Sequence, residues 1–256
     1  MLRRFYFILF CVLVMFTSLE ATRVNYIRVG FFPNVTHAQP LIGLATGVYQ
    51  KHLGKNWQIK SYKFKAGPAA IEAMFAGQLD LLYVGPAPAI NGYIKSKGEI
   101  LRVIAGSASG GAAMVVQPDL RIKDAQGLRG LKIATPQLGN TQDVALRHYL
   151  KINNLKPKEY GGEVSVLPTG NSDLLTLFRS KKIEGAWTVE PWVSLLQYEA
   201  GAKVFLEEKE LWPNGRYTTT VLTARTEFLA ANPKLIKKWL SAHLELTAYL
   251  QKNRKA

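Results

Sequence analysis

Two segments of the chain share a pattern of strand, polar loop and helix start. Residues 27–30 lead into the loop 31–39, and residues 131–134, which lie 104 positions later, lead into the loop 135–142. A second pair lies at nearly the same offset: Leu79-Asp80 and Ile183-Glu184 each lead through an apolar strand to a proline. A repeat this long corresponds to a whole α/β lobe, unless the two junctions are alike by chance. The repeat predicts two lobes with a ligand cleft between them.

Strand and helix patterns alternate along the whole chain, which indicates an α/β fold with parallel-rich sheets. Strands are expected at 25–30, 57–64, 79–84, 101–105, 112–117, 131–134, 164–167, 185–189, 203–205 and 216–224. Helices are expected at 40–49, 67–77, 86–97, 141–151, 172–179, 191–198 and 232–251. The small residues 106–111 should break the fourth strand and let the chain cross between lobes. We therefore expect lobe 1 at 22–108, lobe 2 at 109–215, and a return to lobe 1 at 216–256.

The first 21 residues are typical of a secretory signal peptide. Arg3 and Arg4 precede the apolar run Phe5–Phe16, and small residues follow up to Ala21, where we expect cleavage. An uncleaved N-terminal anchor is the alternative. The single cysteine, Cys11, lies within the apolar run. A mature chain would therefore have no thiol for a disulfide, a nucleophile or a metal site.

The formal net charge of +15 is high, but the cations are spread along the chain. Nucleic-acid binding would be favoured by a dense basic stripe with interleaved aromatic residues, and no such stripe is present. With 48% hydrophobic and 20% charged residues, the chain can bury a sizeable core. We interpret most lysines as solvated surface and expect no nucleic-acid partner.

The polar loops that follow strands are the candidate ligand contacts, because open α/β sheets bind ligands there. A helix start also presents free N–H groups to a small anion. The loops contain no Arg or Lys, which favours neutral donors over a salt bridge. Helix capping alone is the alternative role for these residues. The candidates from the two repeated loops are Asn34, His37, Gln39, Gln137, Gly139, Asn140, Thr141 and Gln142.

Other strand ends add further candidates. Gly85, Pro86 and Ala87 could contribute backbone N–H groups and the shape of the site. Ser107 and Ser109 could donate hydroxyls at the expected crossing, and hinge flexibility is their alternative role. Glu190 could accept from a ligand ammonium, pair with a hinge lysine, or cap the next helix. Trp192 could wall the cleft, although an aromatic residue near a strand end often belongs to the core.

Motifs for catalysis are absent from the sequence. The four histidines show no metal-binding spacing, and no nucleophile elbow, dinucleotide fingerprint or Walker loop follows a strand. We therefore expect no catalytic residues, no metal and no cofactor.

The loops at residues 30–39, 76–89, 132–141 and 187–192 together resemble those of the periplasmic substrate-binding proteins of ABC importers, in the nitrate/sulfonate/taurine group. The resemblance extends from about residue 26 to 245. It implies a two-lobe fold of type II, a periplasmic location, and a monomer that closes on its ligand. The implied partners are a small ligand, a membrane permease and its ATPase.

The resemblance also shapes the ligand hypothesis. It favours an alkanesulfonate or taurine over nitrate, and taurine more strongly if Glu190 faces the ligand. Relatives usually continue for several dozen residues beyond Ala256, so we expect a shortened lobe 1. The alternatives are a protein that binds a pyrimidine precursor of thiamine, a pyrimidine-synthase-like enzyme with a lysine–cofactor site, or a sensor component.

Overall fold

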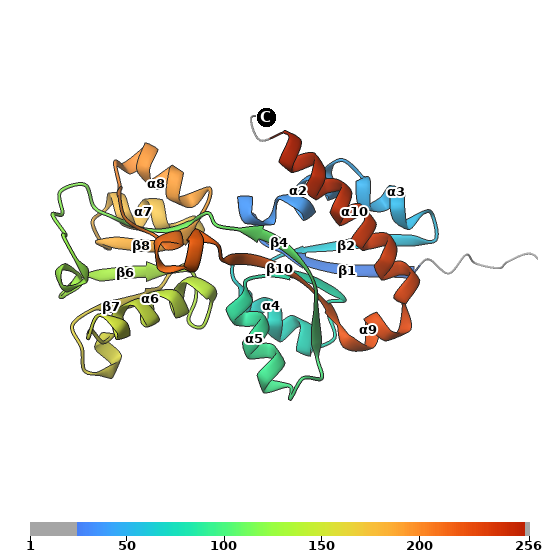
Figure 1. Ribbon diagram of the computed structural model, residues 1–256, viewed down its shortest axis with the longest axis horizontal. Coiled ribbons are helices and arrows are strands. Elements are labelled where there is room, and N and C mark those ends of the chain that lie inside the picture. The colour runs from blue at the N-terminus through green and yellow to red at the C-terminus, as the bar shows by residue number, and fades with distance from the viewer. Residues whose placement is uncertain (1–24, 254–256) are drawn as a thin grey trace, which may run out of the picture.

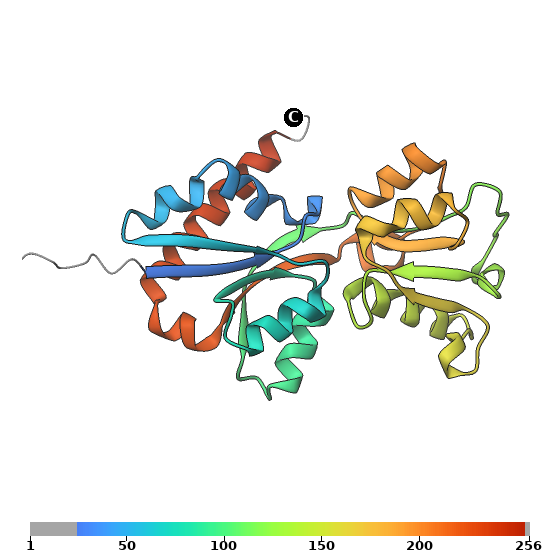
Figure 2. The same cartoon turned by 180° about the vertical axis from the view of Figure 1, so that it is seen from behind.

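The computed structural model describes residues 25–253, so the expected signal peptide and the residues 254–256 lie outside the described part. Two five-stranded sheets, one per lobe, have helices on both faces (Figures 1 and 2). The strands are β1 (Asn25–Phe31), β2 (Trp57–Lys63), β3 (Leu81–Val84), β4 (Leu101–Ser109), β5 (Ala112–Val116), β6 (Lys132–Thr135), β7 (Ser165–Pro168), β8 (Gly185–Val189), β9 (Lys203–Glu207) and β10 (Thr218–Arg225). The α-helices are α2 (Ala38–Ala45), α3 (Val48–Leu53), α4 (Gly67–Phe75), α5 (Pro86–Lys95), α6 (Thr141–Ile152), α7 (Leu174–Arg179), α8 (Trp192–Ala200), α9 (Thr226–Ala231) and α10 (Pro233–Lys252).

The sequence repeat corresponds to a repeat of topology. The strand order is β2-β1-β3-β10-β4 in lobe 1 and β7-β6-β8-β5-β9 in lobe 2. In each sheet the first three strands are parallel, and the fourth position holds an antiparallel strand that enters from the other lobe. The fifth strand pairs antiparallel with that strand, so it runs with the first three. The parallel-rich, two-lobe α/β prediction is confirmed.

Each lobe has its own core, because a sheet with helices on both faces buries both sides of its central strands. All four residues of β3 are buried. In lobe 1, Trp239 of α10 stacks on Tyr49 of α3, with ring centroids 3.9 Å apart. In lobe 2, Trp187 of β8 packs edge-on against Tyr149 of α6. The two cores make each lobe a stable half of the cleft.

Two predicted elements differ from the structure. The helix expected at 40–49 is two helices, α2 and α3, because Gly47 adopts a left-handed conformation with φ 74° and ends the first of them. The strand expected to stop at Ala105 continues to Ser109 as β4. It continues because Gly106 and Ala108 pair with β10, so only Gly110 and Gly111 interrupt the strand.

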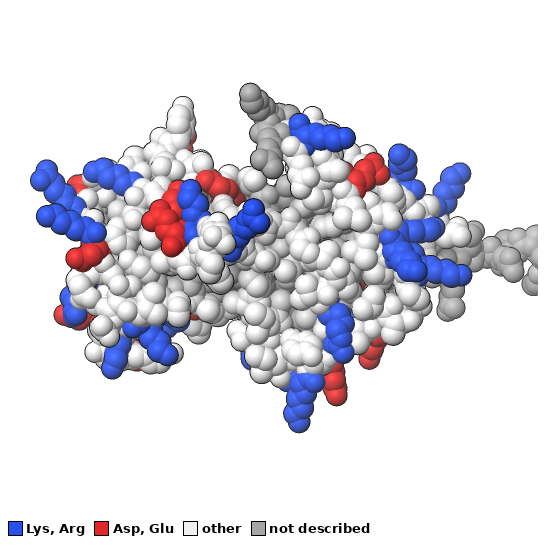
Figure 3. All heavy atoms as spheres, viewed as in Figure 1, with Lys and Arg blue, Asp and Glu red and all other residues white. Residues whose placement is uncertain are grey.

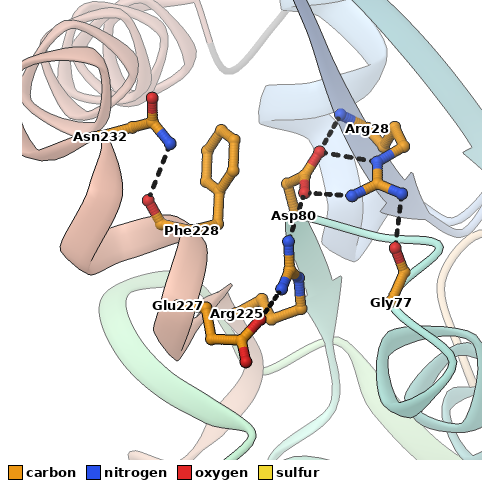
Figure 4. Close-up of polar contacts among 7 residues, drawn as sticks. All are labelled: Arg28, Gly77, Asp80, Arg225, Glu227, Phe228 and Asn232. Atoms are coloured by element: carbon orange, nitrogen blue, oxygen red, sulfur yellow. Dashed lines mark hydrogen bonds and ion pairs between the residues drawn. The ribbon is translucent and has the colours of Figure 1, made fainter.

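Charged side chains hold three strands of lobe 1 together at the end of the sheet that faces away from lobe 2 (Figure 4). Asp80, 1% exposed, accepts hydrogen bonds from the main-chain and side-chain nitrogens of Arg28 in β1 at 2.6–2.9 Å. Arg225 at the end of β10 also donates to Asp80, at 3.3 Å. The pairing of a buried carboxylate with two guanidinium groups satisfies its charge. This cluster lies away from the cleft and is structural.

The chain crosses between lobes twice. Gly110 and Gly111 join β4 to β5, and Arg216 and Tyr217 precede β10 on the way back. The crossings are bonded to each other: the Ser109 hydroxyl donates to the Tyr217 carbonyl at 2.7 Å, and Ala112 N–H donates to the Tyr217 hydroxyl at 3.0 Å. Both lobes therefore meet at one paired connection, which lies beside the candidate site.

Candidate functional site

A cavity of about 30 Å³ lies between the lobes. That volume holds roughly two water molecules. Residues from both lobes and from the crossing strand β10 line it. They are Phe32, Asn34, Thr36, His37, Lys65, Ala66, Gly67, Gly85, Pro88, Pro136, Asn140, Thr141, Gln142, Asn171, Val189, Thr219 and Thr220.

The cavity is electrostatically suited to an anion. Three helices of at least nine residues, α4, α5 and α6, begin at its wall, and a helix N-terminus carries partial positive charge. Lys65 adds a cationic side chain, and no carboxylate lines the cavity. This corrects the expectation of a cleft without Arg or Lys: Lys65 follows β2, in a loop outside the two repeated ones.

Two buried hydroxyl groups on the cavity wall have no hydrogen-bond partner within residues 25–253. They are Thr141 Oγ1, at the start of α6, and Thr220 Oγ1, on β10. A buried polar group without a partner costs about 1–3 kcal/mol, so native structures rarely keep one without a reason. Because these two hydroxyls come from different lobes and line one cavity, they point to a ligand that bridges them.

Gly85 allows the close approach of the lobes at this point. A Cβ atom on Gly85 would lie 2.2 Å from Thr141 Oγ1 and 3.2 Å from Thr141 Cβ. Gly85 has φ −64° and ψ 152°, a backbone conformation open to any residue. Glycine is therefore required here by the lack of space for a Cβ atom beside Thr141 and not by its backbone conformation.

The second repeated loop forms the start of α6. The Asn140 side chain caps the helix, because its Oδ1 accepts from Asp143 N–H at 2.8 Å. Asp143 is buried and accepts from Gly139 N–H at 2.8 Å and from Arg147 Nε at 2.9 Å. These bonds fix the loop, while the Thr141 hydroxyl, on a residue that lines the cavity, is left buried against Gly85 without a partner in residues 25–253.

The first repeated loop uses its polar groups differently. It forms a 3₁₀ turn (Val35–His37), and Asn34 makes no capping bond; its Oδ1 accepts from Trp192 Nε1 of lobe 2 at 2.9 Å. His37 is 2% exposed, and burial lowers its pKa to about 3. Phe32 N–H donates to His37 Nδ1 at 3.4 Å, so the neutral ring carries its proton on Nε2. His37 thus provides an N–H donor at the cavity wall.

Four predicted residues line a separate outer groove of about 490 Å³: Gln39, Ser107, Ser109 and Glu190. Gln39 and Ser107 bond reciprocally, at 2.7 and 2.8 Å, and so tie α2 to β4. Glu190 accepts from the N–H and hydroxyl of Ser194, at 3.1 and 3.0 Å, and so caps α8. Thr36 lines both this groove and the cavity.

The remaining predicted residues lie beside the cavity. Gly139 lines a separate hollow of about 100 Å³ against α4 and α5, and the Gln137 carbonyl accepts from Asn140 N–H at 3.1 Å. Pro86 and Ala87 are the first two residues of α5. The next residue, Pro88, is the one that lines the cavity. Of the 15 predicted residues, the structure brings six to the cavity wall: Asn34, His37, Gly85, Asn140, Thr141 and Gln142.

Sequence reasoning missed Lys65, Asn171, Thr219 and Thr220. Lys65 and Asn171 follow the ends of β2 and β7, so the strand-end rule applied to every strand would have found them. Asn171 accepts from the Thr188 hydroxyl at 2.9 Å, which leaves its NH₂ group as a donor. Thr219 and Thr220 lie in the crossing strand, where no loop signal marks them.

Within residues 25–253, no group of three His, Cys, Asp or Glu side chains is placed to hold a metal ion. No helix in the described part of the chain combines the length and the apolar character needed to span a membrane.

Comparison with known proteins connects this geometry to a family. Residues 20–256 match the NMT1-like family. A protein of Brucella abortus that is named as a binding protein is 25% identical over 220 residues, which are 86% of this chain and 63% of that protein. The chain therefore spans less than two thirds of the length of this relative.

Solved structures with the same fold include two periplasmic binding proteins. The alkanesulfonate-binding protein SsuA from Xanthomonas axonopodis, bound to MOPS, has a TM-score of 0.75 at 16% identity; the match covers 90% of this chain and 75% of that one. The periplasmic nitrate-binding protein NrtA from Synechocystis has a TM-score of 0.73 at 18% identity, over 88% and 61%. At these identities the likeness concerns the fold.

Proposed function

The chain belongs to the NMT1-like family, and on that premise we propose that it is the solute-binding component of an ABC importer, with a small oxyanion held in the interlobe cavity. The observation that carries the proposal is the pair of unpartnered hydroxyls, Thr141 and Thr220. Both can donate to one ligand oxygen or to two oxygens of the same head group. A ligand that accepts from both lobes favours the closed arrangement by its differential affinity.

An acceptor-rich anion fits the cavity better than a cation. The donors at the wall include the two hydroxyls, the His37 Nε2 proton and the Asn171 amide, and Lys65 adds positive charge. A bound ammonium group would meet three helix N-termini and no carboxylate. Charge and hydrogen bonding therefore both support an oxyanion.

The ligand class we propose is a sulfonate or a related small oxyanion. The cavity holds only a head group, and the outer groove, which shares Thr36 with it, has room for a substituent. Glu190, the residue that would favour a zwitterion such as taurine, caps α8 and lines the outer groove. An ammonium group on a substituent in the outer groove would lie near the Glu190 carboxylate, so taurine stays among the proposed ligands beside simple sulfonates.

The cellular setting follows from the same proposal. We place the protein in the periplasm, as a monomer that delivers its ligand to a membrane permease with an associated ATPase. The solved structures of similar fold are named as periplasmic binding proteins for alkanesulfonate and nitrate, which supports this setting. The proposal gives the chain no catalytic activity.

A second candidate ligand is a pyrimidine precursor. Lys65 favours it, because a lysine at the cleft is the group that a pyrimidine-synthase-like enzyme on this fold would use for a cofactor. The cavity of about 30 Å³ disfavours it, since an aromatic ring with substituents needs far more space.

Calorimetric titration of the full chain distinguishes these ligands. The probes are nitrate, methanesulfonate, taurine and a hydroxymethylpyrimidine, in a buffer free of sulfonates and phosphates. We expect at least one oxyanion to bind with a one-to-one stoichiometry. If only the pyrimidine bound, the second candidate ligand would replace the oxyanion. If none of the four probes bound, the proposal would be contradicted.

A further inference from the structure

The end of lobe 1 that lies farthest from lobe 2 carries an apolar groove beside the first described residue. Asn25 pairs with Trp57 between β1 and β2, and its N–H donates to the Asn56 carbonyl at 3.3 Å. Trp57 lines a groove of about 380 Å³ with the residues that join α9 to α10. They are Ala231, Asn232, Pro233, Lys234 and Leu235.

Lys234 lines this groove, and four more exposed lysines lie within five residues of its lining residues along the chain. We call the five the lysine pole: Lys55, Lys60, Lys234, Lys237 and Lys238. Three of them lie at positions i, i+3 and i+4 of α10 and so share one helix face. Lys55 is two residues before Trp57, and Lys60 Nζ lies 3.8 Å from the centre of the Tyr26 ring. Figure 3 shows Lys and Arg side chains gathered at this end of the molecule.

The positive charge of the lysine pole is not compensated within the protein. No ion pair among the described residues involves any of the five lysines. The acidic side chains nearest along the chain to the three lysines of α10, Glu227 and Glu245, pair with Arg225 and His52.

Lys234 is also placed against the dipole of α10. The first turn of α10 contains Lys234 and no acidic residue, and Asn232 makes no capping bond with its side chain. Cations near a helix N-terminus are unfavourable, because that end already carries partial positive charge. An external anionic surface would turn this cost into an attraction.

We propose that the lysine pole binds an anionic phospholipid surface. Lysines around a groove with a partly buried Trp match the membrane interface, where ammonium groups meet phosphates and an indole ring lies at headgroup level. In the uncleaved form of the chain, the apolar run Phe5–Phe16 would also be joined to the fold at this end, where Asn25 begins β1. A membrane is therefore favoured over a nucleic acid.

Docking by the lysine pole leaves the ligand site free. The pole lies at the end of lobe 1 opposite lobe 2, and the cavity lies between the lobes (Figure 1). The surface function is thus independent of the proposed ligand function, and either can fail without the other.

The test is vesicle flotation of the full chain at low salt. Vesicles of phosphatidylcholine alone are compared with vesicles that also contain phosphatidylglycerol. The variant K234Q/K237Q/K238Q removes three charges from the pole, and the control K156Q/K158Q/K182Q removes three exposed charges from lobe 2. A second pole variant, K55Q/K60Q, leaves α10 unchanged. It therefore still tests the pole if the triple variant fails to fold.

We expect wild type and the lobe 2 control to bind anionic vesicles alike. The triple pole variant should bind roughly a hundredfold more weakly, at about fivefold per lysine. If the pole variant and the control lost vesicle binding equally, net charge alone would explain the binding. That result would overturn the proposal. It is also overturned if wild type does not prefer anionic vesicles, or if duplex DNA binds the pole more tightly than the vesicles do.

Discussion

The two repeated loops have the same position in their lobes but opposite uses for their polar groups. In the first loop, Asn34 bonds across to Trp192, and Gln39 bonds to Ser107. In the second, Asn140 caps its own helix, and the Thr141 hydroxyl stays unpartnered at the cavity. The first loop therefore uses two of its polar side chains to join parts of the protein, although His37 still lines the cavity, and the second leaves the Thr141 hydroxyl unpartnered.

The same contrast occurs at the far ends of the sheets. Asp80 accepts from Arg28 N–H at 2.9 Å, and its repeat counterpart Glu184 accepts from Lys132 N–H at 2.8 Å. Asp80 is buried between two arginines, whereas the bond of Glu184 is exposed. In both lobes a carboxylate accepts from a main-chain N–H of the neighbouring strand. Only in lobe 1 is that carboxylate part of a buried charged cluster.

The largest expected effect tests this second contrast. Asp80→Ala should lower the free energy of unfolding by about 3–5 kcal/mol, because it leaves two partly buried arginines without their carboxylate. Glu184→Ala should cost less than about 1 kcal/mol, since its bond is exposed. Urea unfolding of both variants measures the difference. Equal costs would show that the buried cluster is no more important than its exposed counterpart.

The lobes should also respond oppositely to pH. Burial raises the pKa of Glu208 in lobe 2 from 4.5 to about 7, so its contribution to stability is present below pH 4.5 and lost as pH rises through 7. Burial lowers the pKa of His37 in lobe 1 from 6.5 to about 3, so its contribution is present above pH 6.5 and lost as pH falls toward 3.

Glu208→Gln isolates the lobe 2 effect. The variant should raise the free energy of unfolding by on the order of 2 kcal/mol at pH 8 and change it little at pH 4.5, where Glu208 is protonated. The Trp187 Nε1–H donor, 2.8 Å from Glu208 Oε2, can still bond to the amide oxygen. Thermal unfolding at both pH values measures this. The same increase at both pH values would argue against titration of Glu208 as the cause.

The unpartnered hydroxyl of β10 separates ligand binding from stability. Thr220→Val removes a buried hydroxyl that has no partner in the described chain, so the ligand-free fold should not lose stability. Affinity for the best oxyanion should fall by about 1–2 kcal/mol, roughly five- to thirtyfold.

The matched control lies on the same strand. The Thr223 hydroxyl donates to the Leu82 carbonyl at 2.9 Å, away from the cavity. Thr223→Val should therefore lower stability by about 1 kcal/mol and leave affinity unchanged. The contrast fails if both variants bind normally, or if Thr220→Val destabilises as Thr223→Val does.

The smallest effect compares the loops as helix caps. Asn140→Ala should cost about 1 kcal/mol of stability, because it leaves Asp143 N–H without its capping oxygen. Asn34→Ala removes no cap and should instead loosen the contact between lobes through Trp192. Denaturant unfolding gives the first effect, and intrinsic fluorescence compared with that of a Trp192→Phe variant gives the second, because the chain has five tryptophans. If Asn34→Ala lowered the free energy of unfolding as much as Asn140→Ala does, the two loops would not differ as helix caps.

The repeat made the fold predictable, because strand, loop and helix signals recur in the same order in both lobes. The interruptions at Gly47 and Gly110 were predicted less well, since small residues permit a break without requiring one. Gly106 remains in β4 because β10 pairs with it, and that tertiary contact leaves no local signal.

The site was predictable where strand ends carry polar residues, as at Asn140 and Thr141. Where a polar group can also bond within the protein, the sequence left its role open: capping was one of three roles expected for Glu190, and the bonds from Ser194 bear it out. Thr220 was missed for another reason: it faces the cavity from a strand whose alternation alone does not show which face meets the other lobe.

The most direct test of the oxyanion site is a crystal structure of the chain with its tightest-binding oxyanion. Oxygen atoms of the ligand should lie within about 3 Å of both Thr141 Oγ1 and Thr220 Oγ1. A bound ligand elsewhere, or one that leaves both hydroxyls unpartnered, would contradict the proposed site.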